Sequence, residues 1–184
     1  MRVQRGPKGG TRICLPSDAA AGRSLGFLLQ FKGATLAEVM EARAFIEPPL
    51  AGLLARRATR EDIEALEAHL ALEQRLLGDF ESFGLATAEF HHLIVERAGN
   101  VALSVVVSML DDIFLKHVVR FVGRARKDQF SLNERALANH RTLVERIAAR
   151  DPVGAEQSWL KHINDATEII VAELDGPTVL DLYY

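Results

Sequence analysis

Apolar residues recur every three or four positions along the chain from residue 36 to about residue 173. This spacing lines one face of an α-helix with apolar side chains. Polar turn and capping residues interrupt the repeat, so it predicts separate helices that start near residues 36, 60, 80, 101, 132 and 152. Because most interruptions are short, consecutive helices are expected to run antiparallel. The pattern therefore predicts an all-α fold, an antiparallel bundle of six to seven helices.

Residues that begin or end helices stand at several of these interruptions. Thr59 and Asp62 have the spacing of a capping box, in which two side chains cap the first turn of a helix. Gly99 follows the third predicted helix, where glycine readily adopts the left-handed conformation that ends a helix. Pro48 and Pro49 lie inside the first predicted helix and predict a kink there, because each proline removes a backbone donor.

The first 35 residues do not follow the helical repeat. The stretch "RVQRGPKGGTRICLP" has short β-type ends around a Gly-Pro-Lys-Gly-Gly centre, which predicts a short β-hairpin within residues 1–14. Residues 15–35 mix glycine, alanine and serine and are expected to form a linker. The helical domain then covers residues 36–175, and residues 176–184 form a C-terminal tail.

Composition and charge narrow the class of protein. The chain has 184 residues, of which 48% are hydrophobic, enough to bury the core of one main domain. Its formal net charge of −3 argues against a broad basic surface for nucleic acid, although Arg2, Arg5, Lys8 and Arg12 fall close together without an acid among them. The single cysteine, Cys14, cannot form an internal disulfide, and there is no signal peptide or apolar run long enough to span a bilayer. We therefore expect a cytoplasmic protein.

Three of the six histidines fall on the predicted inner faces of three different helices: His91, His140 and His162. His92, about 100° further round its helix than His91, is expected at the surface. One inward histidine is most simply a hydrogen-bonded core residue, because a buried imidazole needs a partner. Three of them in one small bundle favour a shared partner, and a divalent cation bound by imidazole nitrogens satisfies all three. The sequence thus predicts a three-histidine metal site, with zinc or nickel as the preferred ion.

The segments that carry these histidines also resemble a known family. "EARAFIEPPLAGLLARRATREDIEAL", "FHHLIVERAGN" and "NHRTLVERIAARDPVGAEQSWLKHI" are similar to the effector-binding domain of GntR-superfamily transcription regulators, in the FadR-like branch, known as the FCD domain. The resemblance covers about residues 36–173. It implies a metal held by three histidines, which fall on His91, His140 and His162, and by an aspartate, whose position falls on Thr87.

Thr87 is a departure from the family pattern with a chemical consequence. It lies four residues before His91 and shares its helix face, but a neutral hydroxyl is a much poorer ligand than a carboxylate. We therefore expect weaker metal binding and a larger role for water or the effector. Family effectors are commonly small organic acids, whose carboxylate would complete the coordination. Arg43 would pair with a second anionic group of the effector; the alternative is that Arg43 pairs with Glu47, four residues further on.

The resemblance extends to the N-terminal hairpin. "QRGPKGGTRI" is similar to the wing of the family's winged helix-turn-helix domain, so Arg5, Lys8 and Arg12 are the expected DNA-contacting residues. The alternative is that the same residues form a disordered basic tail. The helices that read base edges would lie upstream of this wing, and the chain by itself is expected to bind operator DNA weakly or not at all. A palindromic operator needs two-fold related readers, so the resemblance also implies a homodimer.

Taken together, these features predict the ligand-sensing domain of a bacterial GntR-type regulator, which binds a small carboxylate at a metal site and controls DNA binding. Two alternatives remain. A metal-free regulator that binds acyl-type ligands is favoured by the missing aspartate and disfavoured by the intact histidine triad. A three-histidine metalloenzyme is weaker, because we identify no inward carboxylate near the histidines that would act as a general base. The chain is therefore expected not to be an enzyme.

Overall fold

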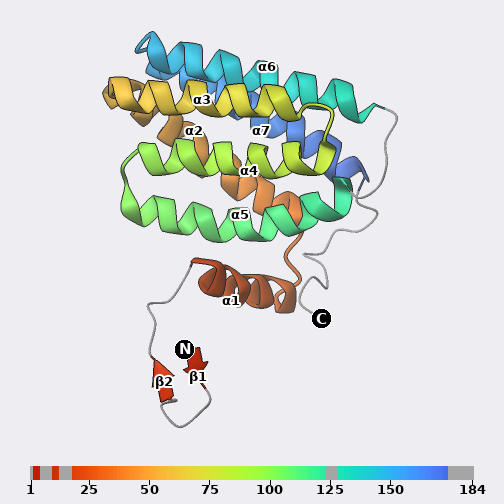
Figure 1. Cartoon of the computed structure of the whole chain (residues 1–184). Helices are drawn as coiled ribbons and strands as arrows, with labels where there is room; N and C mark the ends of the chain where they lie inside the picture. Colours follow the sequence, from red (N-terminus) through yellow and green to blue (C-terminus); the bar gives the residue numbers. More distant parts are fainter. Residues whose placement is uncertain (1, 5–9, 13–17, 123–127, 174–184) are drawn as a thin grey trace.

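The predicted all-α bundle is present in the structure, a computed structural model that describes residues 2–4, 10–12, 18–122 and 128–173 (Figure 1). The described helices are α1 (Asp18–Phe31), α2 (Leu36–Arg57), α3 (Arg60–Leu76), α4 (Phe80–Arg97), α5 (Val101–Val122), α6 (Gln129–Ala148) and α7 (Pro152–Glu173). Consecutive helices from α2 to α5 run back and forth across the bundle, joined by short turns (Figure 1).

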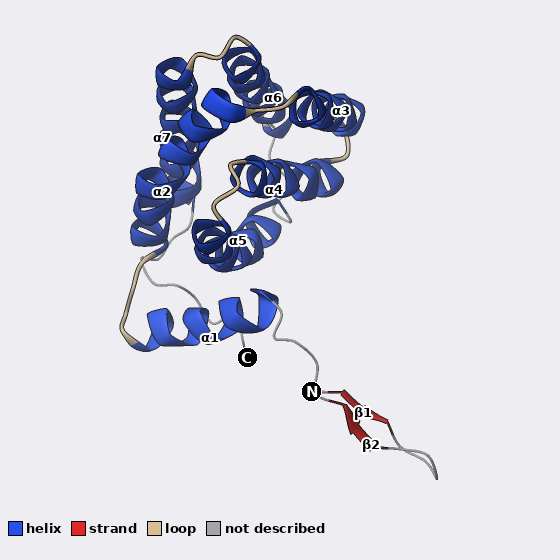
Figure 2. Ribbon diagram, turned by 90° about the vertical axis from the view of Figure 1, so that its left-hand side faces the viewer, coloured by secondary structure: helices blue, strands red, loops and turns tan. Residues whose placement is uncertain are grey.

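The helices α2 to α7 enclose one apolar core. α2 packs along α7, α6 lies beside α7, and α4 lies between α3 and α5 (Figures 1 and 2). The largest side chains of the core are fully buried and come from several of these helices; they include Leu66, Phe90, Ile94, Leu143, Ile147 and Trp159. Complete burial of each such side chain stabilises the fold by roughly 1.5–3 kcal/mol. The site described below lies within this core.

Local capping explains where the helices start and stop. Thr59 and Asp62 cap α3 reciprocally, as the sequence predicts, and Thr35 forms a second capping box with Glu38 at the start of α2. Gly99 has a φ of 70° after α4, in the left-handed region that glycine adopts without strain. α2 continues as one helix from Leu36 to Arg57 through its two prolines.

Helix α1 falls inside the segment expected to be a linker. It packs on α5 and on no other described element (Figure 2), and Leu25 and Leu29 pack against the core. A Cβ on Gly22 would lie 2.9 Å from Oδ2 of Asp112, so the absence of a side chain there lets the two helices approach closely. The apolar face of α1 is short, and its partner lies some eighty residues further on, so the local pattern alone does not reveal this helix.

The N-terminal hairpin is present as two short antiparallel strands, β1 (Arg2–Gln4) and β2 (Gly10–Arg12), with Val3 paired to Thr11. Arg12 lies at the end of β2, whereas Arg5 and Lys8 lie outside the described residues. No helix in the described part of the chain is both long and apolar enough to cross a membrane.

The contact between α2 and α7 yields a stability prediction. A Cβ on Gly52 would lie 3.0 Å from the backbone oxygen of Pro152, so a larger residue must push the two helices apart. Gly52→Leu is expected to lower the free energy of unfolding by about 1–3 kcal/mol, measured by urea denaturation. Gly78→Leu is the control, because nothing lies within 4 Å of a Cβ there. Equal stability of the two variants would contradict close α2–α7 packing at Gly52.

Candidate metal centre

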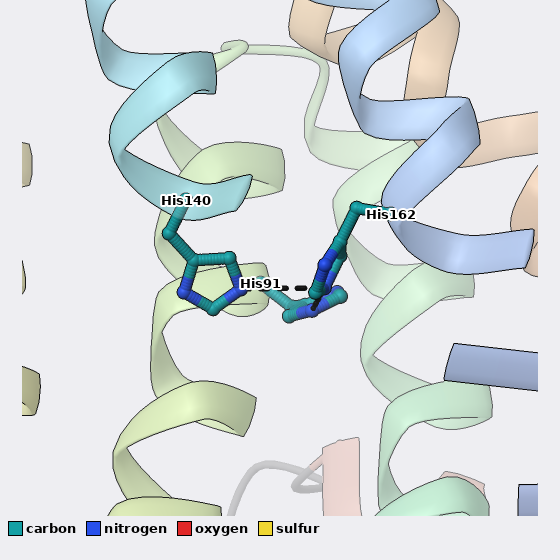
Figure 3. A group of neighbouring side chains, drawn as sticks. All are labelled: His91, His140 and His162. Atoms are coloured by element: carbon teal, nitrogen blue, oxygen red, sulfur yellow. Dashed lines mark hydrogen bonds between the residues drawn. The ribbon is translucent and has the colours of Figure 1, made fainter. Parts of the chain in front are cut away.

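Three buried imidazoles meet at one point between α4, α6 and α7. His91 comes from α4, His140 from α6 and His162 from α7, and their rings point toward one another (Figure 3). Nε2 of His162 lies 3.1 Å from Nε2 of His91 and 3.3 Å from Nε2 of His140. The convergence expected from the sequence is therefore present, and His92, the neighbour of His91, is exposed as expected.

The spacing of these nitrogens suits a divalent ion. Two imidazole nitrogens at about 2.0–2.1 Å from a tetrahedral ion lie about 3.3 Å from each other. The measured Nε2 separations of 3.1 and 3.3 Å match this value closely. Among the described residues, these three histidines are the group of potential ligands that converges in this way, and no carboxylate oxygen belongs to it. The residues present therefore fit a metal bound through three neutral nitrogens.

Two buried carboxylates form hydrogen bonds with the Nδ1 atoms of two of these rings, on the side away from the point where the rings converge. Glu47 of α2 accepts a hydrogen bond from Nδ1 of His91 at 3.0 Å, and Glu73 of α3 accepts one from Nδ1 of His140 at 2.9 Å. Both glutamates are fully buried. A proton held on Nδ1 leaves the lone pair of Nε2 free, which is the form of histidine that binds a metal. Each carboxylate thus orients its ring and favours the tautomer with the proton on Nδ1.

The protonation states follow from burial and from the neighbouring charges. Burial lowers the pKa of His91 to about 4, so this imidazole is neutral at pH 7. Burial holds the pKa of His162 well below its usual range, and the cost of charging it beside two other imidazoles acts in the same direction. Burial opposes ionisation of Glu47, but the nearby Arg43 and the hydrogen bond from His91 lower its pKa to about 2. An ionised Glu47 accepts hydrogen bonds only, so a proton between it and His91 belongs to Nδ1, whereas Arg43, which lies 2.9 Å from the same Nδ1, competes there as a donor.

The third ring, His162, is held by stacking and by an amide. Its ring lies nearly parallel to that of Trp159, with centroids 4.9 Å apart, and the Trp159 indole donates a hydrogen bond to Glu47 at 3.1 Å. Nδ2 of Asn139 lies 3.4 Å from Nδ1 of His162. An amide offers a donor and an acceptor, so Asn139 accommodates either tautomer of His162 after rotation of its side chain.

Arg43 forms a buried ion pair on the inner face of α2. Its Nε donates to Glu47 at 2.6 Å, which is the alternative pairing considered from the sequence. Nη2 lies 2.9 Å from Nδ1 of His91, so this ring nitrogen faces both a donor from Arg43 and the carboxylate of Glu47. Nη2 also lies 3.1 Å from Asp111 of α5, with which it makes no hydrogen bond, and the guanidinium lies over the ring of Phe114 at 4.2 Å. Burial raises the pKa of Asp111 to about 7, against the effect of Arg43. Nη1 contacts the sulfur of Met40 at 3.8 Å, a weak acceptor.

A cavity of about 140 Å³ opens beside the histidines. An engineered cavity of similar size holds one benzene molecule, so this space suits a ligand of a few heavy atoms. His91, His162, Arg43 and Thr87 contribute polar groups to its wall, and most of the remaining wall is apolar, including Phe83, Phe114, Ile163, Ala166 and Ile170. The Thr87 hydroxyl oxygen is buried and has no hydrogen-bond partner.

Sequence reasoning missed three of the residues that shape this centre. Glu73 and Asn139 were not identified as contacts of the histidines, and Glu47 was considered only as a partner of Arg43. Two inward carboxylates that the sequence analysis did not identify, Glu47 and Glu73, contact the histidines, and both do so at Nδ1. The burial of Glu73 could have been predicted from the sequence, because Glu73 shares a helix face with Leu66 and Leu70 of α3. Its partner on α6 is set by the tertiary packing.

Comparison with known proteins places this geometry in a family. The model of the FCD domain matches residues 38–165, most of the described bundle. The chain belongs to the FCD domain family. The resemblance to the effector-binding domain of GntR-type regulators is thus confirmed. Curated relatives include the HTH-type transcriptional repressor NanR of Enterobacter sp. (strain 638), 28% identical over 85% of this chain and 60% of that protein. NanR of Cronobacter sakazakii (strain ATCC BAA-894) is 26% identical over 70% of this chain and 48% of that protein.

Solved structures with the same fold include two bacterial proteins. Streptococcus agalactiae GntR aligns with a TM-score of 0.64 at 22% identity, over 90% of this chain and 74% of that one. E. coli McbR/YncC aligns with a TM-score of 0.67 at 17% identity, over 74% of this chain and 67% of that one. At these identities the likeness concerns the fold alone. The chain spans about half to three fifths of the length of the curated relatives.

The position of Thr87 generates a first prediction for this centre. Thr87→Asp is expected to tighten the binding of a divalent metal, because a carboxylate adds a formal negative charge and a hard oxygen beside three neutral nitrogens. Calorimetric titration of the variant and the parent with Zn²⁺ at the same pH measures the difference. Equal or weaker binding by the variant would show that residue 87 does not approach the metal.

The contact between Glu73 and His140 generates a second prediction. Glu73→Gln keeps an acceptor for Nδ1 but removes the charge that favours a proton there, so Zn²⁺ affinity is expected to fall about 10–100-fold. Glu67→Gln is the matched control on an exposed position of α3 and should leave the affinity unchanged. The same affinity in both variants would mean that Glu73 does not tune the metal centre.

Proposed function

We propose that this chain is the effector-sensing part of a GntR-type transcription regulator and that it binds a small organic acid at a metal centre. The observation that carries the proposal is the convergence of three buried histidines beside a small cavity, within a domain of the FCD family. His91, His140 and His162 are the proposed metal ligands, with Thr87 in the position where the family has an aspartate. Zinc or nickel fits the all-nitrogen donor set best.

The effector is a small carboxylate in this proposal. Bound in the cavity, one carboxylate completes the coordination of the metal, while Arg43 faces a second anionic group with its weakly satisfied Nη1. When bound, the metal supplies a positive charge that attracts the carboxylate. Phe83, Phe114 and Ile170 enclose the carbon skeleton of the ligand.

A route from the cavity to the N-terminal part of the chain supports a regulatory role. Asp111 of α5 faces Arg43 at the cavity, and the next residue, Asp112, lies against Gly22 of α1. A ligand that competes for Arg43 therefore acts on the helix on which α1 rests. We propose that this shift reorients DNA-binding domains in a homodimer. Operator DNA is read by the helix-turn-helix domain to which the wing residues Arg5, Lys8 and Arg12 would belong.

Both alternative functions fit the cavity less well. A space of about 140 Å³ is too small for a long acyl chain, and three imidazoles line or adjoin it. For an enzyme, a general base is needed on the cavity side of the metal. Glu47 and Glu73 contact Nδ1 atoms instead, on the far side of the rings, and the other polar side chains of the described cavity wall are Arg43, Thr87, Gln129 and Asn133. None of these four is a base at neutral pH.

Metal loading of adjacent histidine variants tests the proposed centre. His91→Ala is expected to abolish stoichiometric binding of Zn²⁺ or Ni²⁺, because one of three ligands is lost. His92→Ala is the matched control, because His92 is the next residue on the same helix and is exposed. Metal content after dialysis, measured by mass spectrometry, should separate the two variants. Retention of the metal by His91→Ala would remove the proposed ligand set.

The regulatory part of the proposal has its own test. A thermal-shift screen of organic acids, with and without chelator, identifies an effector, and the full-length regulator is then titrated with operator DNA in its presence. The effector is expected to change operator affinity, and light scattering is expected to give a dimer mass. An effector that binds the bundle without changing operator affinity would contradict a sensing role.

A further inference from the structure

The metal centre of this chain has no negative charge of its own on the side that faces the cavity. A histidine binds a metal through a neutral nitrogen, and no carboxylate oxygen among the described residues belongs to the group that converges here. The two nearest acids, Glu47 and Glu73, are already occupied by Nδ1–H groups behind the rings. A divalent ion at this point therefore carries a charge that the first ring of ligands leaves uncompensated, which disfavours its burial.

The Thr87 hydroxyl is a polar group without a partner at the same place. Thr87 lies one helical turn before His91 and lines the cavity together with His91 and His162. Its oxygen is buried and makes no hydrogen bond. A buried hydroxyl left without a partner is unfavourable, so the site favours a ligand that accepts a hydrogen bond from it. A hydroxyl also differs from the family's aspartate in the ligands that it favours. It can donate a hydrogen bond to an anion, whereas an aspartate carboxylate would repel the same anion.

We propose that Thr87 makes the binding of metal and of an anionic effector mutually dependent in this chain. Its hydroxyl donates a hydrogen bond to a carboxylate of the effector, and that carboxylate supplies the negative charge that the metal lacks. The inference rests on the proposed function and adds a rule of regulation to it: the effector recruits the metal, and the metal recruits the effector. Because coupling between two ligands is reciprocal, each must raise the affinity of the other by the same factor.

Three substitutions at position 87 separate the hydroxyl from the shape of the side chain. Thr87→Val keeps the branched shape and removes the donor, Thr87→Ser keeps the donor, and Thr87→Asp supplies a fixed carboxylate. Acetate serves as the anionic probe, because it is small enough for the cavity, and acetamide as its neutral control of similar shape. Zn²⁺ affinity is measured for all four proteins with each probe, with free Zn²⁺ set by a competing chelator dye.

Acetate is expected to raise the Zn²⁺ affinity of the parent chain at least about tenfold, while acetamide leaves it unchanged. Thr87→Ser should retain most of this effect and Thr87→Val should lose most of it, each measured against the Zn²⁺ affinity of the same variant without acetate. Thr87→Asp should bind Zn²⁺ tightly without acetate and gain little or nothing from it. The visible absorption of Co²⁺ in place of Zn²⁺ provides a second readout, because entry of a carboxylate into the coordination sphere changes its spectrum.

The outcomes separate this inference from the proposed function. Tight Zn²⁺ binding that depends on the histidines but not on acetate would overturn the inference and leave the proposed metal centre in place. The same acetate effect in Thr87→Val as in the parent would also overturn it, because the hydroxyl would then play no part. Absence of Zn²⁺ binding to the parent chain, with and without acetate, would overturn both.

Discussion

The centre of this protein depends on two hydrogen bonds between buried carboxylates and imidazoles. Glu47 and Glu73 each hold a proton on Nδ1 of a histidine, and this leaves the Nε2 lone pairs of His91 and His140 directed at one point. Nε2 of His162 lies 3.1 Å from Nε2 of His91 and 3.3 Å from Nε2 of His140. Nitrogen lone pairs this close repel one another unless a proton or a cation lies between them. The arrangement therefore favours a positive charge at this point in the interior of the bundle.

That preference explains why the surrounding core contains ionised groups that would otherwise destabilise it. Arg43 balances the charge of Glu47 within one helix, and Trp159 satisfies a further lone pair of Glu47. A buried charge is tolerated when its hydrogen bonds are complete, and Glu47 meets this condition with three partners. Asp111 is less well satisfied, and its raised pKa reflects this. Buried polar groups without a hydrogen bond include the carboxylate of Asp111, which faces Arg43, and the hydroxyl of Thr87, which lines the cavity.

The contrast between the two sides of the centre links structure to the proposed function. Behind the rings, each hydrogen bond is made within the chain, so the orientation of His91 and His140 is fixed before any ligand arrives. In front of them, the cavity offers neutral nitrogens, a free hydroxyl and an arginine, and no described carboxylate joins the nitrogens there. Such a site suits the cation and the small anion proposed as its ligands. The same cavity reaches α5 through Arg43 and Asp111, and α5 carries α1.

The sequence by itself determined which helices form and which faces they bury. The period of apolar residues and the capping pairs are local properties, so the bundle from α2 to α7 and the inward positions of His91, His140 and His162 follow from spacing alone. Three inward histidines in one small bundle already favoured a shared ion, and the family resemblance added the expectation that Thr87 lies beside it. Only the tertiary structure decided which groups stand behind the rings. Glu73 and His140 are 67 residues apart, and Glu47 and His91 are 44 apart. Their contacts depend on how α2, α3, α4 and α6 pack, which no local pattern encodes. The tertiary structure also decided the docking of α1 on α5. The short apolar face of α1 gains stability only from a helix that lies far along the chain.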